Sequence, residues 1–255
     1  MGRSPAFLLP LLLVACASHP GMPDIADHAL GLAPLPEILM LGEQHDAPQH
    51  QEGHRQVVAT LAARGQLAAV ALEMAEQGLS TGALARDASE ADVQAALRWT
   101  DAAWPWAAYR PAVMAAVAAG VPVVGANLPR SALRNVMGDA ALDAVLPAPA
   151  LQAQQRAVRA GHCELLPESQ IAPMARVQIA RDRAMARTLA DLRAPGRTVV
   201  LLAGSAHVDP ELGVPRHLPA AVRTHSVAWP PQPQKKDYCE ELRQRIKPPT
   251  PGAAP

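Results

Sequence analysis

Three short segments of the chain place ionisable side chains directly after apolar runs. Glu43 and His45 belong to a Gly-Glu-Gln-His segment, Glu73 closes a second apolar run, and His207 ends a Gly-Ser-Ala-His segment. Imidazole and carboxylate groups transfer protons near neutral pH, hydrogen-bond a cofactor, or bind a divalent metal. One such segment carries little information, because a strand-end glutamate often only caps a helix or pairs with an arginine. Three segments in one repeating pattern predict a shared functional cleft.

The apolar runs before these residues predict the strands of a sheet. The runs are short, and stretches with helical spacing separate them, which indicates buried strands that alternate with helices. The expected strands cover residues 37–41, 67–74, 121–124, 197–203 and 223–229. We predict an α/β fold: a mostly parallel sheet with helices on both faces and a helical insertion or lid within 130–194. Sites in such folds lie where the carboxyl ends of the strands meet, so the four residues should converge there.

The helix predicted over Pro48–Arg64 carries two further histidines. His50 and His54 are four residues apart and therefore share a face of the helix. The spacing suits metal ligands, but no glutamate stands beside His50 as it does in the zinc-protease helix. We expect His50 to face the cleft and His54 to lie at the surface.

Aromatic residues are concentrated between Trp99 and Tyr109, which contain four of the six tryptophan and tyrosine residues. The tryptophans are expected to pack together and to fix a helical insertion. Tyr109 differs from them because a phenol can ligate ferric iron, and flat aromatic neighbours suit a porphyrin. The alternative for Tyr109 is a buried tyrosine with a hydrogen-bonded hydroxyl.

The composition restricts the class of protein. With 23 basic and 23 acidic residues the formal net charge is zero, so no long-range field favours nucleic acid as a partner. Apolar residues make up 49% of the chain, enough for a full core in one domain.

The start of the chain is typical of an exported protein. Residues 1–15 combine one arginine with an apolar run that is too short to span a bilayer, which needs about 20 residues, and they predict a signal peptide. Leu13-Val14-Ala15-Cys16 resembles a lipobox and predicts lipidation of Cys16, with an ordinary cleaved signal as the alternative. Ala17 in place of aspartate favours anchoring in the outer membrane.

With Cys16 lipidated, Cys163 and Cys239 are the two remaining cysteines, and export places them in an oxidising compartment. We predict a disulfide between them, with two free thiols as the alternative. The predicted organisation is a signal peptide (1–15), a lipid-anchored tether (16–35), the α/β domain (36–230) and a Pro-rich C-terminal tail (231–255).

Short motifs spread over residues 38–218 make the chain resemble the ChaN-type family of haem-binding, iron-regulated bacterial lipoproteins. They are Leu41–Asp46 with His50, Leu72–Met74, Trp106 with Tyr109–Pro111, Asn127–Arg130, His162-Cys163, Leu166-Pro167, Gln178 with Arg181-Asp182, Met185-Ala186, Gly204–His207, Gly213–Pro215 and His217-Leu218.

The resemblance implies that haem is held between two protomers with a tyrosine on the iron, and thus a homodimer on haem binding. Tyr109 matches that ligand, and His207 or His162 would supply a histidine near the haem. The chain has no Cys-x-x-Cys-His segment, so the haem would be bound non-covalently. An outer-membrane haem or iron receptor is a possible partner of such a protein.

The same family is distantly similar to erythromycin esterases and Tiki-type metalloproteases, in which the Gly-x-x-His turns and the strand-end glutamate form the catalytic or metal-binding set. This similarity implies an alternative function, a metal-dependent or Glu/His hydrolase that uses Glu43, His45, Glu73 and His207. There is no Gly-x-Ser-x-Gly nucleophile elbow. The sequence therefore favours a lipid-anchored haem-binding protein for haem and iron uptake over an enzyme.

Overall fold

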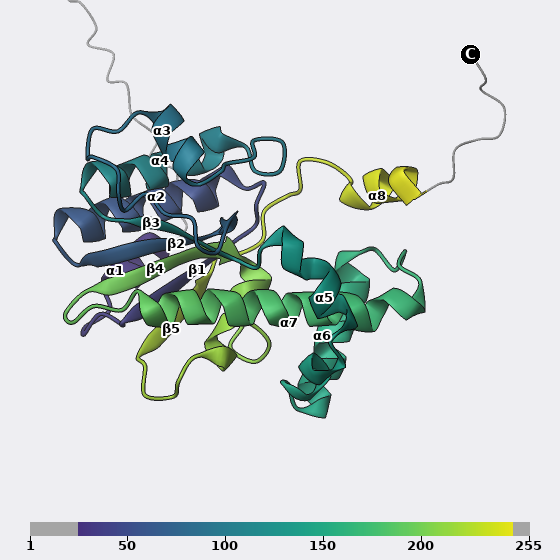
Figure 1. Cartoon of the computed structure of the whole chain (residues 1–255). Helices are drawn as coiled ribbons and strands as arrows, with labels where there is room; N and C mark the ends of the chain where they lie inside the picture. Colours follow the sequence, from purple (N-terminus) through teal and green to yellow (C-terminus); the bar gives the residue numbers. More distant parts are fainter. Residues whose placement is uncertain (1–24, 247–255) are drawn as a thin grey trace, which may run out of the picture.

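The computed structural model describes residues 25–246 and contains a five-stranded sheet with helices on both faces (Figure 1). The strands are β1 (Ile38–Glu43), β2 (Leu67–Glu76), β3 (Val123–Asn127), β4 (Thr198–Gly204) and β5 (Thr224–Ala228). Their order in the sheet is β3-β2-β4-β1-β5, and every neighbouring pair is parallel. The predicted α/β fold class is confirmed.

The central strands are mostly apolar because both of their faces are covered. Alternate residues of β1 enter different cores: Leu39 and Leu41 pack on one face of the sheet, whereas Ile38 and Met40 pack on the other. All residues of β1 and β4 are buried. A buried parallel strand has no solvent-facing side and so shows a continuous apolar run instead of alternation.

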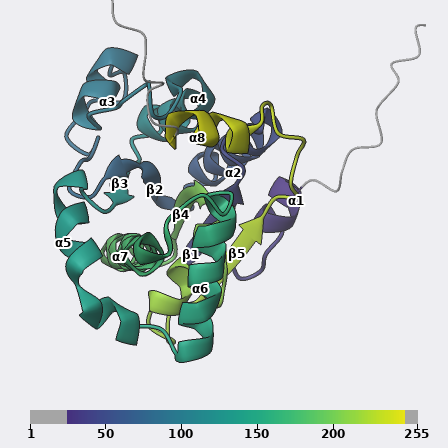
Figure 2. The ribbon, with the colours of Figure 1, turned by 90° about the vertical axis from the view of Figure 1, so that its right-hand side faces the viewer.

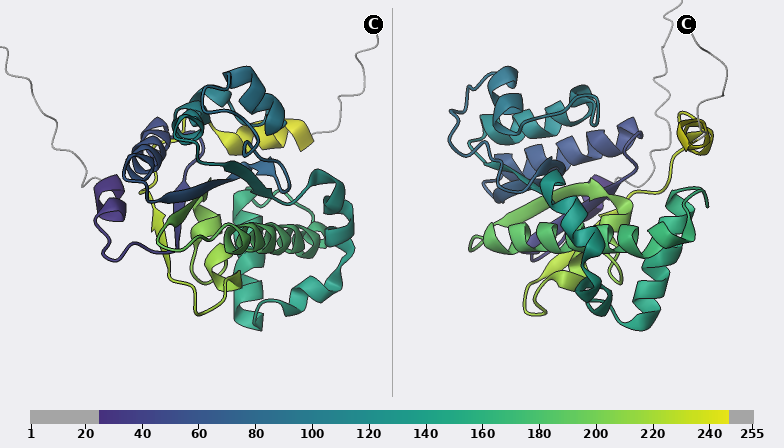
Figure 3. Two further views of the ribbon diagram at one scale, coloured as in Figure 1. Left: turned by 60° about the vertical axis from the view of Figure 1, so that its left-hand side comes forward. Right: turned by 45° about the vertical axis from the view of Figure 1, so that its right-hand side comes forward.

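Helices α1 (Ile25–Leu30), α2 (Pro48–Ala63), α3 (Glu90–Ala96) and α4 (Trp106–Ala118) cover the first face (Figure 3). Helix α2 begins with Pro48, which lacks the N–H that would be unpaired in a first turn. It ends before Gly65, whose φ of 66° lies in the left-handed region that favours glycine.

The second face is covered by the long helix α7 (Glu168–Asp191) and by the 3₁₀ segments η3 (Ser205–Val208) and η4 (Val214–His217). The stretch between β3 and α7 forms the predicted helical insertion. It contains η1 (Arg130–Ala132), α5 (Leu133–Gly138), η2 (Ala140–Ala144) and α6 (Ala148–Gly161). These elements, here called the helical arm, pack against α7 (Figure 2).

The folded part of the chain extends beyond the predicted limits at both ends. Ala26 and Ala29 of α1 are buried in the first core, so part of the segment expected to be a tether belongs to the domain. At the other end, residues 231–246 include helix α8 (Tyr238–Ile246), and a disulfide joins Cys239 to Cys163 after the helical arm. The predicted cysteine pair is thus present.

The predicted signal peptide, the lipidation site Cys16, the beginning of the tether and the last nine residues of the tail lie outside the described residues. Within residues 25–246, no helix is both long and apolar enough to cross a membrane.

Candidate functional site

The loops that follow two neighbouring strands run to opposite faces of the sheet. β1 and β4 are adjacent, with Glu43 beside Gly204 in register. After β1 the chain continues into α2 on the first face, and after β4 it continues into η3 on the second face. Such a switch point leaves the carboxyl ends of both strands accessible to side chains from either face. The residues predicted for the cleft follow these two strands and β2.

Glu43 forms the first half of the site, on the side of α2 and α4. By alternation it points to the same face as Leu41, where its carboxylate is 1% exposed and meets several donors. Tyr109 donates its hydroxyl to Glu43 Oε1 at 2.6 Å, and His45 Nδ1 lies 2.7 Å from the same oxygen. Gln51 Nε2 is 3.4 Å from the second oxygen. A carboxylate oxygen accepts hydrogen bonds, so a proton on His45 Nδ1 would be donated to Glu43.

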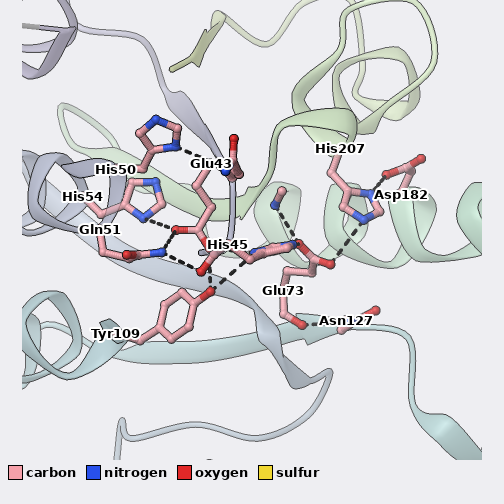
Figure 4. Close-up of polar contacts among 12 residues, drawn as sticks. Glu43, His45, His50, Gln51, His54, Glu73, Tyr109, Asn127, Asp182 and His207 are labelled. Atoms are coloured by element: carbon pink, nitrogen blue, oxygen red, sulfur yellow. Dashed lines mark hydrogen bonds and ion pairs between the residues drawn. The ribbon is translucent and has the colours of Figure 1, made fainter. Parts of the chain in front are cut away.

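Glu73 forms the second half, on the side of α7 and η3 (Figure 4). Its Oε2 accepts the backbone N–H of Gly204 at 2.7 Å, and its Oε1 lies 3.3 Å from His207 Nε2. The other ring nitrogen of His207 is 2.6 Å from Asp182 Oδ1 on α7. Glu73 lies within β2, which continues to Glu76, past the predicted end of the strand at residue 74, and the β2–β3 pairing shifts register between Leu72 and Glu76.

His45 joins the two halves. Its Nε2 is 3.8 Å from Glu73 Oε2, and its ring meets the indole of Trp104 edge-on with centroids 4.7 Å apart. The imidazole lies so close to Gly204 that a Cβ there would be 2.8 Å from Nε2. The His45 side chain is 38% exposed, whereas those of Glu43, Glu73 and His207 are almost fully buried, so a ligand meets His45 first.

The four predicted cleft residues therefore lie together, and with Tyr109 and Asp182 they form one cluster, here called the carboxyl-end cluster. Its contacts run from Tyr109 through Glu43, His45, Glu73 and His207 to Asp182. The functional roles of its members stay predictions.

Charge stabilises the buried half of the cluster. Burial alone would lower the pKa of His207, but the charge of Glu73 and the hydrogen bond with Asp182 raise it to about 10. Burial opposes ionisation of Glu73, yet the charge and hydrogen bond of His207 hold the pKa of Glu73 below its ordinary value. Burial raises the pKa of Asp182 to about 6 against the pull of His207. At neutral pH an imidazolium is thus held between two carboxylates.

The other half of the cluster favours proton transfer at His45. Burial lowers the pKa of His45, but the hydrogen bond to Glu43 and the charge of Glu73 outweigh burial and raise it. Burial and the charge of Glu43 raise the pKa of Tyr109, so its phenol keeps its proton and donates it to Glu43. The chemistry available is a carboxylate–imidazole pair that accepts a proton at the exposed His45.

Tyr109 is buried in this arrangement, with 1% of its surface exposed. Its ring lies among the tryptophans, 5.6 Å from Trp99 and 6.2 Å from Trp104 between centroids. Trp99 donates its indole N–H to the carbonyl of Trp104, and Trp106 donates to Glu90. The tryptophans pack as expected, and Trp104 additionally covers His45.

Three histidines differ in their relation to the cluster. His162 follows α6, where its Nδ1 meets the carbonyl of Val158, and it contacts no member of the carboxyl-end cluster. His50 is buried and accepts the backbone N–H of Gln44, which fixes the turn that carries His45. His54 was expected at the surface, and this prediction is wrong: it is 1% exposed and lies 3.4 Å from Glu43 Oε2.

The physical reason for the burial of His54 is Trp229, which follows β5 and packs edge-on against its ring with centroids 5.1 Å apart. Helical spacing cannot reveal this contact between residues 175 positions apart. The sequence analysis did not identify Gln51 and assigned no role to Asp182. The apolar spacing along α7 places Asp182 on the buried face of that helix, and this spacing is the signal that could have identified it.

The arrangement offers no preformed metal site. Among residues 25–246, no group of three or more His, Cys, Asp or Glu side chains is placed to hold a metal ion. The polar groups of the cluster are directed at one another: both nitrogens of His207 meet carboxylates, and the carboxylate of Glu43 is already hydrogen-bonded to Tyr109 and His45.

Comparisons with known proteins concern the fold and the family of the chain. The fold is similar to the solved structure of ChaN of Campylobacter jejuni, described as showing cofacial haem binding, with a TM-score of 0.64, 23% identity, and coverage of 79% of this chain and 84% of that chain. At this identity the likeness concerns the fold alone. No curated protein matches the chain. The sequence of residues 35–218 matches the family described as haem-binding uptake, Tiki superfamily, ChaN. Since this match spans more than half of the chain, the protein belongs to the ChaN family of the Tiki superfamily.

Proposed function

We propose that this protein binds haem for iron uptake at the bacterial cell envelope, anchored through lipid on Cys16. The observation that carries the proposal is membership of the haem-binding uptake family over residues 35–218. The fold shared with ChaN of Campylobacter jejuni supports it, because that structure is described by its cofacial haem binding. The proposed complex is a homodimer that forms on haem binding and delivers haem to or from an outer-membrane receptor.

Tyr109 is the proposed iron ligand, and its surroundings define what ligation requires. The hydroxyl must leave Glu43 Oε1, 2.6 Å away, and the Trp104 side of the carboxyl-end cluster must open, since the ring is buried. A proton acceptor is already in place, because Glu43 and His45 form a hydrogen-bonded pair beside the phenol. The phenol can therefore lose its proton locally when it binds ferric iron.

The histidine expected near the haem is better supplied by His162 than by His207. Both ring nitrogens of His207 meet carboxylates inside the protein. His162 uses only Nδ1, on the carbonyl of Val158. It is the residue directly after α6, at the end of the helical arm. We propose that His162 contacts a haem held between protomers.

A hemin titration followed in the Soret region tests the proposal. The full chain should bind hemin tightly and stoichiometrically with a high-spin ferric spectrum. Tyr109→Phe removes the hydroxyl and keeps the ring, so it should weaken binding and abolish the phenolate charge-transfer band. Tyr238→Phe is the matched control, because Tyr238 is the other tyrosine and lies exposed on α8. Wild-type protein that leaves the hemin spectrum unchanged would refute haem binding.

The anchor has its own test. Cells that express the wild-type chain should incorporate labelled palmitate into it and retain it in the outer-membrane fraction. Cys16→Ser should lose the label, and Cys163→Ser, which leaves the predicted lipobox intact, should keep it. Equal labelling of Cys16→Ser and wild type would refute the anchor.

The intact carboxyl-end cluster favours one alternative function, a hydrolase that works through Glu and His without a metal. His45 is placed as a general base would be: its Nδ1 faces the carboxylate of Glu43, and its ring is partly exposed. Ester cleavage that persists in chelator and is lost in His45→Ala, while the exposed His28→Ala on α1 retains it, would support this function. Absence of cleavage over a panel of esters and peptides would leave haem binding as the remaining proposed function.

A further inference from the structure

The end of the sheet opposite the carboxyl-end cluster carries two adjoining hollows. One has a volume of about 430 Å³ and lies between the turn after α7 and Arg223. The second, of about 220 Å³, extends from there toward Pro34–Pro36, before β1. Both are lined by Glu37, Gly196 and Arg223. The lining residues place the hollows at the amino ends of β1, β4 and β5. In Figure 1 these strand ends lie on the side of the sheet away from the helical arm.

Three guanidinium groups line these hollows, and one carboxylate orients two of them. Arg193 donates through Nη1 to Glu37 Oε1 at 3.0 Å, and Arg223 Nε lies 3.7 Å from Glu37 Oε2. Each of the two arginines keeps further N–H groups for a ligand, and the Arg223 side chain is 60% exposed. Arg197 lines the smaller hollow and has no side-chain partner among the described residues.

A buried acceptor gives the smaller hollow a second polar feature. Gln66 lines it, and Gln66 Oε1 is buried without a hydrogen-bond partner among the described residues. A buried carbonyl oxygen without a donor costs free energy. Because this oxygen has almost no exposed surface, a ligand hydroxyl would meet it only when the Gln66 side chain turns into the hollow, and the oxygen would then gain the hydrogen bond that it lacks. Guanidinium groups alone would predict any anion, whereas Gln66 adds a preference for a ligand with a hydroxyl donor.

We propose that these hollows, here called the arginine hollow, bind a phosphate ester that carries a free hydroxyl, with glycerol phosphate as the simplest example. The fork of a guanidinium matches two phosphate oxygens, and a phosphate offers enough oxygens for Arg193, Arg197 and Arg223 together. The larger volume falls in the range of small-molecule sites. With one carboxylate against three guanidiniums, the hollow keeps a net positive charge.

Two sources can supply this chemistry, a phospholipid headgroup and a soluble phosphate ester. The described chain begins at residue 25, nine residues after Cys16, which is a reach of at most about 30 Å. An anchored chain would therefore keep the start of α1 within about 30 Å of the lipid surface. This makes the headgroup source testable, while binding itself does not depend on the anchor or on haem.

Calorimetric titration of the full chain with sn-glycerol 3-phosphate, and separately with inorganic phosphate, tests the proposal. We expect glycerol phosphate to bind more tightly than phosphate, and Gln66→Ala to remove that difference. Arg223→Gln should weaken glycerol phosphate binding about tenfold, in line with the loss of one charge-assisted hydrogen bond. Arg243→Gln is the matched control, since Arg243 is likewise exposed and paired with a glutamate.

Vesicle co-sedimentation with the Cys16→Ser full chain separates the sources. Preference for phosphatidylglycerol over phosphatidylcholine vesicles that is reduced by Arg223→Gln and not by Arg243→Gln assigns the site to headgroups. Glycerol phosphate binding without this preference assigns it to soluble esters. No binding to either probe, or equal losses in Arg223→Gln and Arg243→Gln, would overturn the proposal and leave Arg193, Glu37 and Arg223 a structural ion-pair group.

Discussion

His45 Nε2 and Glu73 Oε2 lie 3.8 Å apart, and this contact joins the two halves of the carboxyl-end cluster. Glu43 follows the alternation of β1 toward α2 and α4, while Glu73 faces α7 and η3. His45 reaches across the carboxyl end of β4 between them. Because Gly204 lacks a side chain, nothing separates the imidazole from Glu73, and a proton accepted at His45 changes the field at both carboxylates.

The pH dependence of stability should report His207. The pKa of His207 is raised from 6.5 to about 10 in the folded protein, so its contribution is fully present below about pH 6.5 and is lost as the pH rises toward 10. We expect urea unfolding of the wild type to show falling stability across this window. His207→Gln should flatten that fall, and at pH 7 it should cost about 3 kcal/mol because Glu73 is left as a buried charge. Parallel pH profiles for both proteins would contradict the assignment.

His54 predicts the opposite dependence, on the acid side. Burial lowers the pKa of His54 from 6.5 to about 4, so the unfolded chain gains a proton there before the folded chain does. Stability should therefore fall as the pH drops from about 6.5 to 4. His54→Leu should reduce this acid loss, whereas the exposed His28→Leu should not. Equal acid sensitivity of both variants would count against a buried neutral His54.

The disulfide should stabilise the C-terminal segment. Cys163 and Cys239 are 76 positions apart, and in the chain-entropy model closing such a loop stabilises the folded state by about 4 kcal/mol. Peptide mapping without reduction should recover one linked 163–239 pair, and Cys239→Ser should lower the thermal midpoint. A thermal midpoint that reduction leaves unchanged would contradict the expected stabilisation.

A side chain at Gly204 should change His45 more than it changes stability. A Cβ there would lie 2.8 Å from His45 Nε2, so Gly204→Ala must displace the imidazole, which is the end of a side chain that is 38% exposed and can move. We expect less than about 1 kcal/mol of change in unfolding free energy, because the crowded atoms are not in a closed core. The pKa of His45, which the nearby carboxylates raise, should fall toward its ordinary value in an NMR titration. Gly138→Ala is the control because a Cβ at Gly138 meets no atom within 4 Å. An unchanged His45 titration in Gly204→Ala would mean that His45 is not held where the structure places it.

Local patterns in the sequence were sufficient for the strands and for four members of the carboxyl-end cluster. The buried strands show as apolar runs because both faces of a parallel sheet are covered, and the Gly-x-x-His turns mark where β1 and β4 end. Because all strands run in the same direction, the side chains of Glu43, His45, Glu73 and His207 lie at the same end of the sheet, where the strands terminate. The cysteine pair followed from the predicted compartment and from the number of cysteines left.

Only the tertiary structure decided the partners. The strand order, with β4 between β2 and β1, places the backbone N–H of Gly204 on Glu73, although the two residues are 131 positions apart. The burial of His54 depends on Trp229 in the same way. Helices α1 and α8 are short and show no long apolar period: α1 contributes Ala26 and Ala29 to the first core, and α8 is joined to the domain by the disulfide. Local sequence determines which backbone conformation a segment adopts, whereas long-range packing determines which side chains meet, and packing forms only when distant segments fold together.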